Sequence, residues 1–194
     1  LDLVLVKKVY FLLSKSKCLN SKLYGKVLML VNDAQPSTNG YIGLAEYYDF
    51  KKDDAKVDEM YAKALSLTTS KPQKGEVYFE LAKRAKASKR FLKAREYALK
   101  TISSGVHENE AYTMIGDLYM YNSYEKCKTT DAVISRGVYL AAFNMYEKAG
   151  NKSKMELAQK QFPSDQEIFF TNRKIGQTIQ TGCWVGQSVV IRKR

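Results

Sequence analysis

The stretch from Tyr112 to Tyr119 constrains the fold of this 194-residue chain more than any other part of the sequence. At 3.6 residues per turn, four of its residues fall on one face of a helix: Tyr112, Ile115, Gly116 and Tyr119. A glycine inside a helix costs roughly 1 kcal/mol relative to alanine, so its place in this stripe needs a packing reason. The sequence therefore predicts that a second helix approaches closely at Gly116.

The same stripe appears twice upstream at nearly constant spacing. Tyr41 precedes Tyr78 by 37 residues, and Tyr78 precedes Tyr112 by 34. Each stripe is followed by a second one with small residues at helical spacing: Val57, Tyr61 and Ala64; Ala94, Ala98 and Thr101; Ala142, Tyr146 and Ala149. One stripe can arise by chance, but its recurrence in register indicates repeated pairs of helices.

The pattern aromatic-x2-Leu/Ile-small-x2-Tyr resembles the first helix of a tetratricopeptide repeat (TPR), and the resemblance covers residues 41–149. It implies an all-α protein, an α-α superhelix of TPR-like helical hairpins. The units are expected at about 41–72, 75–105 and 109–150 within a repeat region that spans 41–172. An insertion at 122–137 either extends both helices of the third unit or forms a loop.

Two further segments flank the repeat region. Residues 1–40 predict an N-terminal helical pair, at 2–13 and 20–32, that serves as a degenerate repeat or a cap, because terminal repeats are commonly atypical. Residues 173–194 predict a small C-terminal β-hairpin and a basic tail, since β-branched residues alternate there around glycines. The segment Gly182–Gly186 also looks like the tail of a group of bacterial proteins of this type.

Helix boundaries near the C-terminus carry clear local signals. Ala149–Asn151 is expected to stop the third unit, with Gly150 in the left-handed region. A helix is expected at 153–161, and Ser164 with Glu167 predicts a capping box that opens a short helix.

The formal net charge of +12 is concentrated at the two ends: +4 in residues 1–40, +5 in 173–194 and only +3 in 41–172. A nucleic-acid interface is more often a basic stripe along one face, so this distribution argues against nucleic acid as the main partner. A nucleic-acid-associated helical repeat protein that uses its basic ends, including Arg192–Arg194, is the first alternative function.

The sequence offers few parts for catalysis or metal binding. Cys18, Cys127 and Cys183 are far apart, no two form a C-x2-C pair, and His107 is the only histidine. No phosphate-binding glycine loop is present. A cysteine beside Trp184 on a strand is expected to be buried packing. We predict no enzyme, with no catalytic, cofactor or metal site, and the cysteine count gives no disulfide framework.

The resemblance implies a scaffold or adaptor that binds a protein or peptide ligand in a concave groove, lined by the leading helix of each pair. The groove residues expected here are Asn39, Ile42, Glu46, Asp49, Glu76, Phe79, Lys83, Lys86, Glu110, Thr113, Asp117 and Met120. Some family members grip a terminal carboxylate there with Lys and Asn residues, but Glu46 and Asp117 lie near Lys83 and Lys86 in this pattern. The competing interpretation is an ordinary solvated helix surface.

A membrane-surface accessory module is the second alternative, because residues 2–13 and 20–32 are apolar. The stretch Leu3–Leu13 is too short to span a bilayer and is interrupted by Lys7 and Lys8. Because the chain begins at Leu1, the sequence leaves open whether a leader peptide precedes it. The location is accordingly left open between the cytoplasm and the periplasm. The oligomeric state is also left open.

Overall fold

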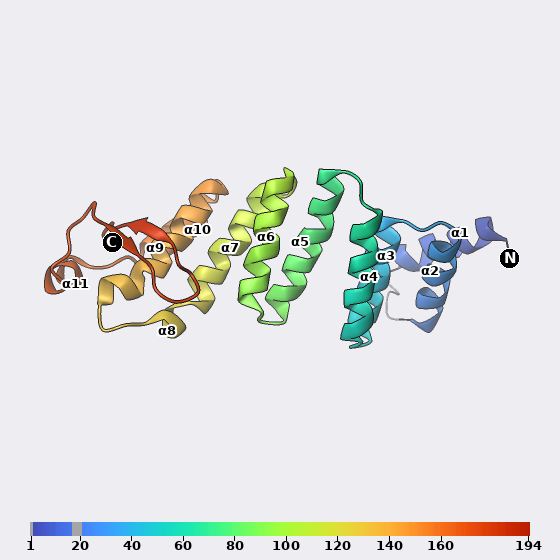
Figure 1. The fold of residues 1–194 in the computed structure, drawn as a ribbon, viewed down its shortest axis with the longest axis horizontal. Coiled ribbons are helices and arrows are strands. Elements are labelled where there is room, and N and C mark those ends of the chain that lie inside the picture. Colours follow the sequence, from blue (N-terminus) through green and yellow to red (C-terminus); the bar gives the residue numbers. More distant parts are fainter. Residues whose placement is uncertain (1, 17–20) are drawn as a thin grey trace. The chain divides into compact units, whose positions relative to one another are not determined.

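The computed structural model describes residues 2–16 and 21–194, and these form helices and one small sheet (Figure 1). The fold is all-α with a C-terminal β-hairpin, as predicted from the sequence. The elements are α1 (Leu3–Lys15), α2 (Lys22–Ala34), α3 (Thr38–Phe50), α4 (Asp54–Leu67), α5 (Lys71–Ala87), α6 (Phe91–Ser104), α7 (Glu108–Asn122), α8 (Tyr124–Cys127), α9 (Ala132–Lys148), α10 (Lys152–Gln159), α11 (Asp165–Phe170), β1 (Thr178–Gln180) and β2 (Ser188–Val190). Cys18 lies outside the described residues.

The chain divides into two compact units, residues 1–81 and 82–194. The boundary falls inside α5, whereas the sequence suggested segments 1–40, 41–172 and 173–194. Within the described part of the chain, no helix is both long enough and apolar enough to cross a membrane.

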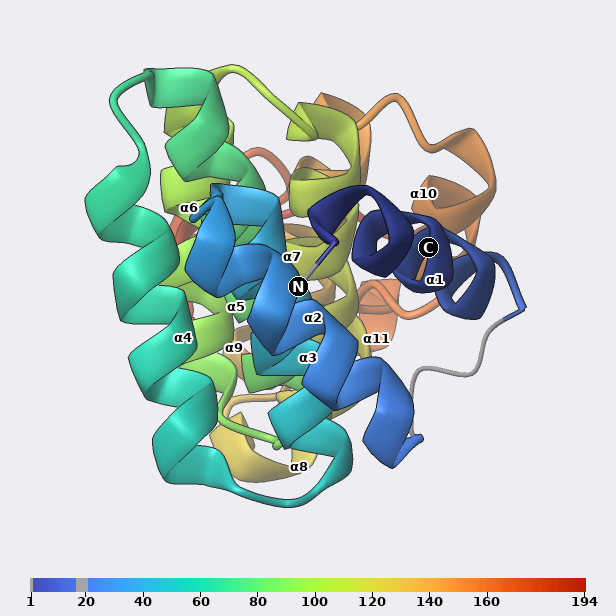
Figure 2. The same cartoon turned by 90° about the vertical axis from the view of Figure 1, so that its right-hand side faces the viewer.

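In unit 1, α1 packs on α2, α2 on α3, and α3 on α4 (Figure 2). Polar N-caps begin these helices, because a side-chain oxygen there accepts an otherwise unpaired backbone N–H; the capping residues are Asp2, Ser21, Ser37 and Asp53. The predicted N-terminal pair matches α1 and α2 to within about two residues. Since Ser37 caps α3, Asn39 and Gly40 belong to that helix.

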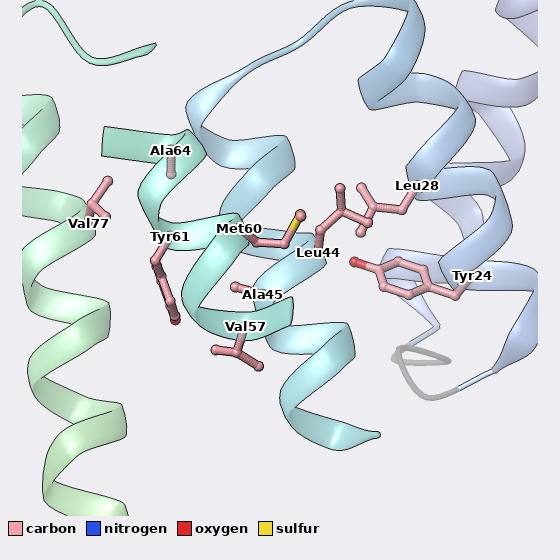
Figure 3. Close-up of a cluster of buried hydrophobic side chains, with 9 residues drawn as sticks. All are labelled: Tyr24, Leu28, Leu44, Ala45, Val57, Met60, Tyr61, Ala64 and Val77. Carbon is pink, nitrogen blue, oxygen red and sulfur yellow. The ribbon is translucent and has the colours of Figure 1, made fainter. Parts of the chain in front are cut away.

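The core of unit 1 gathers the predicted stripe residues (Figure 3). Ala45 of α3 is fully buried near Tyr61 of α4, and Val77 of α5 joins the same cluster. Tyr24 of α2 closes the other side, stacked on Tyr10 of α1 at 5.9 Å between ring centroids. Burial, with the Tyr10 hydroxyl nearby, raises the pKa of Tyr24 to about 12.

In unit 2, α7 packs on both α6 and α9, and α10 packs on α9 (Figure 1). Gly116 lies in the middle of α7 and is buried. A Cβ atom at this position would collide with the ring of Tyr146 on α9. The predicted close approach of a second helix at Gly116 is therefore confirmed, and Tyr146 is the residue that makes it.

The insertion at 122–137 both lengthens a helix and forms a loop. After α7 ends at Asn122, the chain makes the short helix α8 and a loop that reaches Asp131. The Asp131 carboxylate then accepts the backbone N–H of Ile134 at 2.9 Å and begins α9. The second helix of this pair therefore starts inside the predicted insertion and is 17 residues long.

The local C-terminal signals are confirmed with one exception. Gly150 ends α9 with φ of +67°, and Ser164 with Glu167 forms the predicted capping box of α11. β1 pairs antiparallel with β2, with Ile179 opposite Val189. The prediction of a strand at 183–185 is wrong, because these residues lie in the connection between β1 and β2. Cys183 there has φ of +64°, which a strand residue does not adopt.

Candidate functional site: a pocket around Asp117

Unit 2 brings four of the predicted groove residues together in one pocket of about 640 Å³. The end of α5, one face of α7 and the turn from α9 to α10 line it. The lining residues are Lys86, Asn109, Glu110, Thr113, Met114, Asp117, Ala149, Gly150, Asn151, Lys152 and Ser153. Lys86, Glu110, Thr113 and Asp117 were expected in a groove; the turn residues were not.

Asp117 is the polar centre of this pocket, with only 15% of its side chain exposed. Its carboxylate accepts three hydrogen bonds: from the Tyr146 hydroxyl at 3.0 Å, from Lys86 Nζ at 3.1 Å and from Lys154 Nζ at 2.5 Å. Burial opposes ionisation of this carboxyl, but the bonds from Lys154 and Lys86 outweigh it and lower its pKa. Asp117 is therefore an anion at neutral pH, held between two cations.

Tyr146 connects the packing of the helices to this polar centre. Its ring fills the space opposite Gly116, and its hydroxyl donates to Asp117 one residue further along α7. Burial, and then the adjacent Asp117 carboxylate, raise the pKa of Tyr146, so the hydroxyl keeps its proton. One side chain thus sets the spacing of α7 and α9 and fixes the Asp117 carboxylate.

The chemistry of the pocket suits an extended peptide better than an isolated carboxylate. Lys86, one of the two lysines that a carboxylate clamp would use, already pairs with Asp117, and the other, Lys83, lies outside the pocket. The remaining polar lining groups are amides from Asn109 and Asn151, hydroxyls from Thr113 and Ser153, and the charges of Glu110 and Lys152. Amides and hydroxyls pair with the alternating N–H and C=O groups of a peptide backbone.

Unit 1 contains a separate pocket of about 650 Å³ that includes three other predicted residues. Asn39 and Ile42 line it from α3, and Glu76 lines it from α5. The other lining residues are Ser37, Thr38, Gln73 and Glu80. Among the described residues, its charged lining groups are Glu76 and Glu80, so its chemistry differs from that of the Asp117 pocket.

The remaining predicted residues lie outside both pockets. Glu46 and Asp49 are exposed on α3, Phe79 is half-buried and Lys83 exposed on α5, and Met120 is half-buried on α7. Six of the twelve groove residues thus belong to unit 1 and six to unit 2.

Two features of unit 2 were missed by sequence reasoning. Cys127 and Cys183 form a disulfide, with their Cα atoms 5.2 Å apart. Arg95 of α6 donates from Nη1 to the backbone oxygens of Trp184 and Val185, at 2.6 and 2.8 Å. The expectation of buried packing at Cys183 is therefore wrong, because Cys183 is exposed and its sulfur is bonded to Cys127.

His107, the only histidine in the sequence, is not among the side chains that donate hydrogen bonds to Asp117 at the centre of the pocket. His107 is the N-cap residue of α7, with Nδ1 3.7 Å from a Glu110 oxygen. Across residues 2–16 and 21–194, no cluster of three His, Cys, Asp or Glu side chains is arranged to hold a metal ion.

Comparison of the chain with protein-family models, with curated proteins and with solved structures gave no match.

Proposed function

We propose that this chain is a non-catalytic scaffold or adaptor of the TPR type that binds an extended protein segment through the Asp117 pocket. The observation that carries the proposal is the arrangement of this pocket on paired helices. Thr113 and Asp117 lie on α7, whose packing against α9 is fixed by Gly116 and Tyr146, and Lys86 adds a cation from the end of α5. Because pocket residues such as Asn109, Glu110 and Lys152 are exposed and take no part in this packing, they can vary with the partner while the fold is retained.

The repeated stripes support the TPR-type assignment. Ala45 and Gly116, which occupy the same place in their stripes, are both buried against a second helix. Tyr61 and Tyr146, at equivalent positions of the second helices, are buried as well. The same packing solution at equivalent positions of two helix pairs is what a tandem repeat requires.

Affinity capture with charge-reversed variants tests this proposal. The variant Glu110→Lys/Lys152→Glu changes two exposed pocket residues and conserves net charge. The matched control, Glu156→Lys/Lys160→Glu, changes two exposed residues outside the pocket, one in α10 and one at its C-cap. Capture from soluble and envelope lysates should retain a discrete protein, insensitive to nuclease, with wild type and the control but not with the pocket variant.

The same capture distinguishes the alternatives. Equal retention by both variants would contradict binding in this pocket. A captured species that disappears after nuclease treatment would instead support the alternative of a nucleic-acid-associated protein. Circular dichroism melting of each variant confirms that loss of binding is not loss of fold.

A membrane-surface role for α1 is the second candidate, because this helix exposes its apolar residues. Phe11 is 63% exposed, and Val4, Leu5 and Leu12 are similarly open beside Lys7 and Lys8. An apolar face flanked by lysines is typical of helices that lie in a bilayer interface. Flotation with anionic liposomes, lost in Phe11→Glu/Leu12→Glu, would support this role; no flotation of wild type would exclude it.

A further inference from the structure

A second pocket of unit 2, of about 380 Å³, surrounds the start of α6. Its lining comes from four places: the turn between α5 and α6, the first turn of α6, α8, and the connection between β1 and β2. The lining residues are Lys89, Arg90, Phe91, Leu92, Lys93, Lys126 and Trp184. Four of these seven side chains are cations, the other three are apolar, and none is acidic.

The apolar floor of this basic aromatic pocket is packed and held in place. The rings of Phe91 and Trp184 stack at 6.0 Å between centroids, and Lys126 Nζ lies 4.7 Å from the centre of the Phe91 ring. Arg95 fixes the backbone of Trp184 from behind through its bond to the carbonyl oxygen. The disulfide joins the residues next to Lys126 and Trp184, so it ties two walls of the pocket together.

Little negative charge balances the cations at this site. Lys93 pairs with Glu96 at 2.9 Å. In the described part of the chain, Lys89, Arg90 and Lys126 make no ion pair. Clustered like charges repel one another, and an anionic partner would relieve that repulsion.

Two neutral donors add to the positive potential. The N-cap residue of α6, Arg90, makes no side-chain capping bond, so the first N–H groups of this 14-residue helix lack that acceptor. The indole Nε1 of Trp184 is buried and, among the described residues, has no hydrogen-bond acceptor. Backbone N–H groups at a helix N-terminus are donors that carboxylate oxygens satisfy well, whereas the buried indole N–H contributes only its local dipole.

We propose that the basic aromatic pocket binds an acidic protein segment, in which Asp or Glu residues flank an apolar side chain. The carboxylates pair with Lys89, Arg90 and Lys126, and the apolar side chain contacts Phe91, Leu92 and Trp184. This is a second binding site, separate from the Asp117 pocket, and it fits a different partner chemistry.

The aromatic rings favour an acidic protein segment over single-stranded nucleic acid. Single strands gain their affinity by stacking bases on open aromatic faces. Here the Phe91 ring is already covered by Trp184 and Lys126, and Trp184 is also packed against Tyr119 and Arg95. Phe91 and Trp184 are half-buried, so a ligand meets their remaining open surface, the exposed Leu92 and the cations around them, and not a free ring face.

Fluorescence anisotropy with a defined probe tests the proposal on the full chain. The probe is a capped, fluorescein-labelled peptide, Glu-Asp-Glu-Phe-Glu-Asp-Glu, and a version with lysine at each acidic position is its counterpart. The pocket variant Lys89→Glu/Arg90→Glu is compared with Lys160→Glu/Lys174→Glu, a control with the same change in net charge at exposed residues elsewhere in unit 2. Thermal melting checks that both variants fold.

The acidic probe should bind wild type saturably, and the lysine counterpart should not. The pocket variant should lose at least about tenfold in affinity while the control stays within about twofold, because direct ionic contacts outweigh screened distant charge. Equal loss in both variants would overturn the proposal. Binding of labelled (dT)20 through this pocket with no binding of the acidic peptide would also overturn it.

The same titration separates this inference from the proposed scaffold function. Glu110→Lys/Lys152→Glu, which alters the Asp117 pocket, should leave the affinity of the acidic probe unchanged. A loss of probe binding in that variant would show that the acidic segment binds in the Asp117 pocket, and it would overturn the assignment of this segment to the basic aromatic pocket.

Discussion

At the scale of single residues, the neighbours Gly116 and Asp117 both contribute to the contact between α7 and Tyr146 of α9, but in different ways. Gly116 has no side chain, and this lets the ring of Tyr146 lie against α7. Asp117 receives the hydroxyl of the same tyrosine and two lysines. Packing and electrostatics can therefore be perturbed separately by substitutions one residue apart.

Replacing Gly116 by leucine should overpack the contact between α7 and α9. We expect a loss of roughly 1–3 kcal/mol in the free energy of unfolding, because the added atoms meet the buried Tyr146 ring. Urea denaturation followed by circular dichroism measures it. Glu147→Leu, at an exposed position on α9, is the control and should change stability by less than about 0.5 kcal/mol. An unchanged midpoint for Gly116→Leu would refute the close approach.

Replacing Asp117 by asparagine should destabilise unit 2 in a pH-dependent way. The folded-state pKa of Asp117 is lowered, so its contribution is present above the unfolded value of about 3.9 and is lost as pH falls through the folded pKa. At pH 7 we expect the variant to be about 2 kcal/mol less stable, as for a hydrogen bond to a charged group. The difference should shrink below about pH 4.

Chemical denaturation at several pH values checks this expectation for Asp117. Asp165→Asn, which removes an exposed ion pair with Lys193, is the control and should cost at most about 1 kcal/mol. A difference for Asp117→Asn that stayed constant from pH 7 to pH 3 would show that ionisation of this carboxyl contributes nothing.

At the scale of elements, the C-terminal hairpin packs on α9 and is also joined to α6 by the Arg95 side chain and to α8 by a covalent bond. Arg95 reaches from α6 to the connection between β1 and β2, where it satisfies two backbone carbonyls. The disulfide links the end of α8 to the same connection. The hairpin itself has only two short strands, and isolated hairpins are marginally stable, so these attachments hold it in place.

Removing the disulfide should therefore affect unit 2 strongly. In the chain-entropy description, a crosslink across a separation of 56 residues contributes about 4 kcal/mol at 25 °C. We expect Cys127→Ser/Cys183→Ser to lose a stability of this order, and reductant to lower the melting temperature of wild type but not of the variant. Differential scanning calorimetry measures both. A melting temperature of wild type that ignores reductant would contradict the contribution of this bond.

At the scale of the whole molecule, the sequence predicts those parts of the fold that repeat or that depend on local chemistry. The stripes around Tyr41 and Tyr112 predict paired helices. Gly116, in the stripe around Tyr112, predicts the close approach of a second helix to α7. Caps such as Ser164 and stops such as Gly150 are local signals, so they were found as well.

The features that the sequence did not predict depend on contacts between distant segments. Three cysteines allow three pairings, and nothing in their spacing selects Cys127 with Cys183. Arg95 is one of 32 basic residues, and only the fold places it beneath the β1–β2 connection. The connection itself alternates like a strand at 183–185, but Cys183 has φ of +64° there, and its bond to Cys127 and the packing of Trp184 join segments far apart in the sequence.

The candidate site was predicted only in part, because some of its residues follow from helical spacing and others depend on contacts between distant segments. Helical spacing put Thr113 and Asp117 on one face, and the structure places both in the pocket. The turn residues Asn151–Ser153 were missed because their position depends on where α9 ends relative to α7.

Site-specific photo-crosslinking in cells tests the proposed scaffold function most directly. A benzophenone amino acid replaces Asn109, an exposed residue that lines the Asp117 pocket, and in a matched variant replaces Gln159, an exposed residue of α10 outside it. The account predicts a discrete protein adduct at Asn109 that is absent at Gln159 and is lost when Glu110→Lys/Lys152→Glu is added. The same adducts at both positions, or none at Asn109, would contradict it.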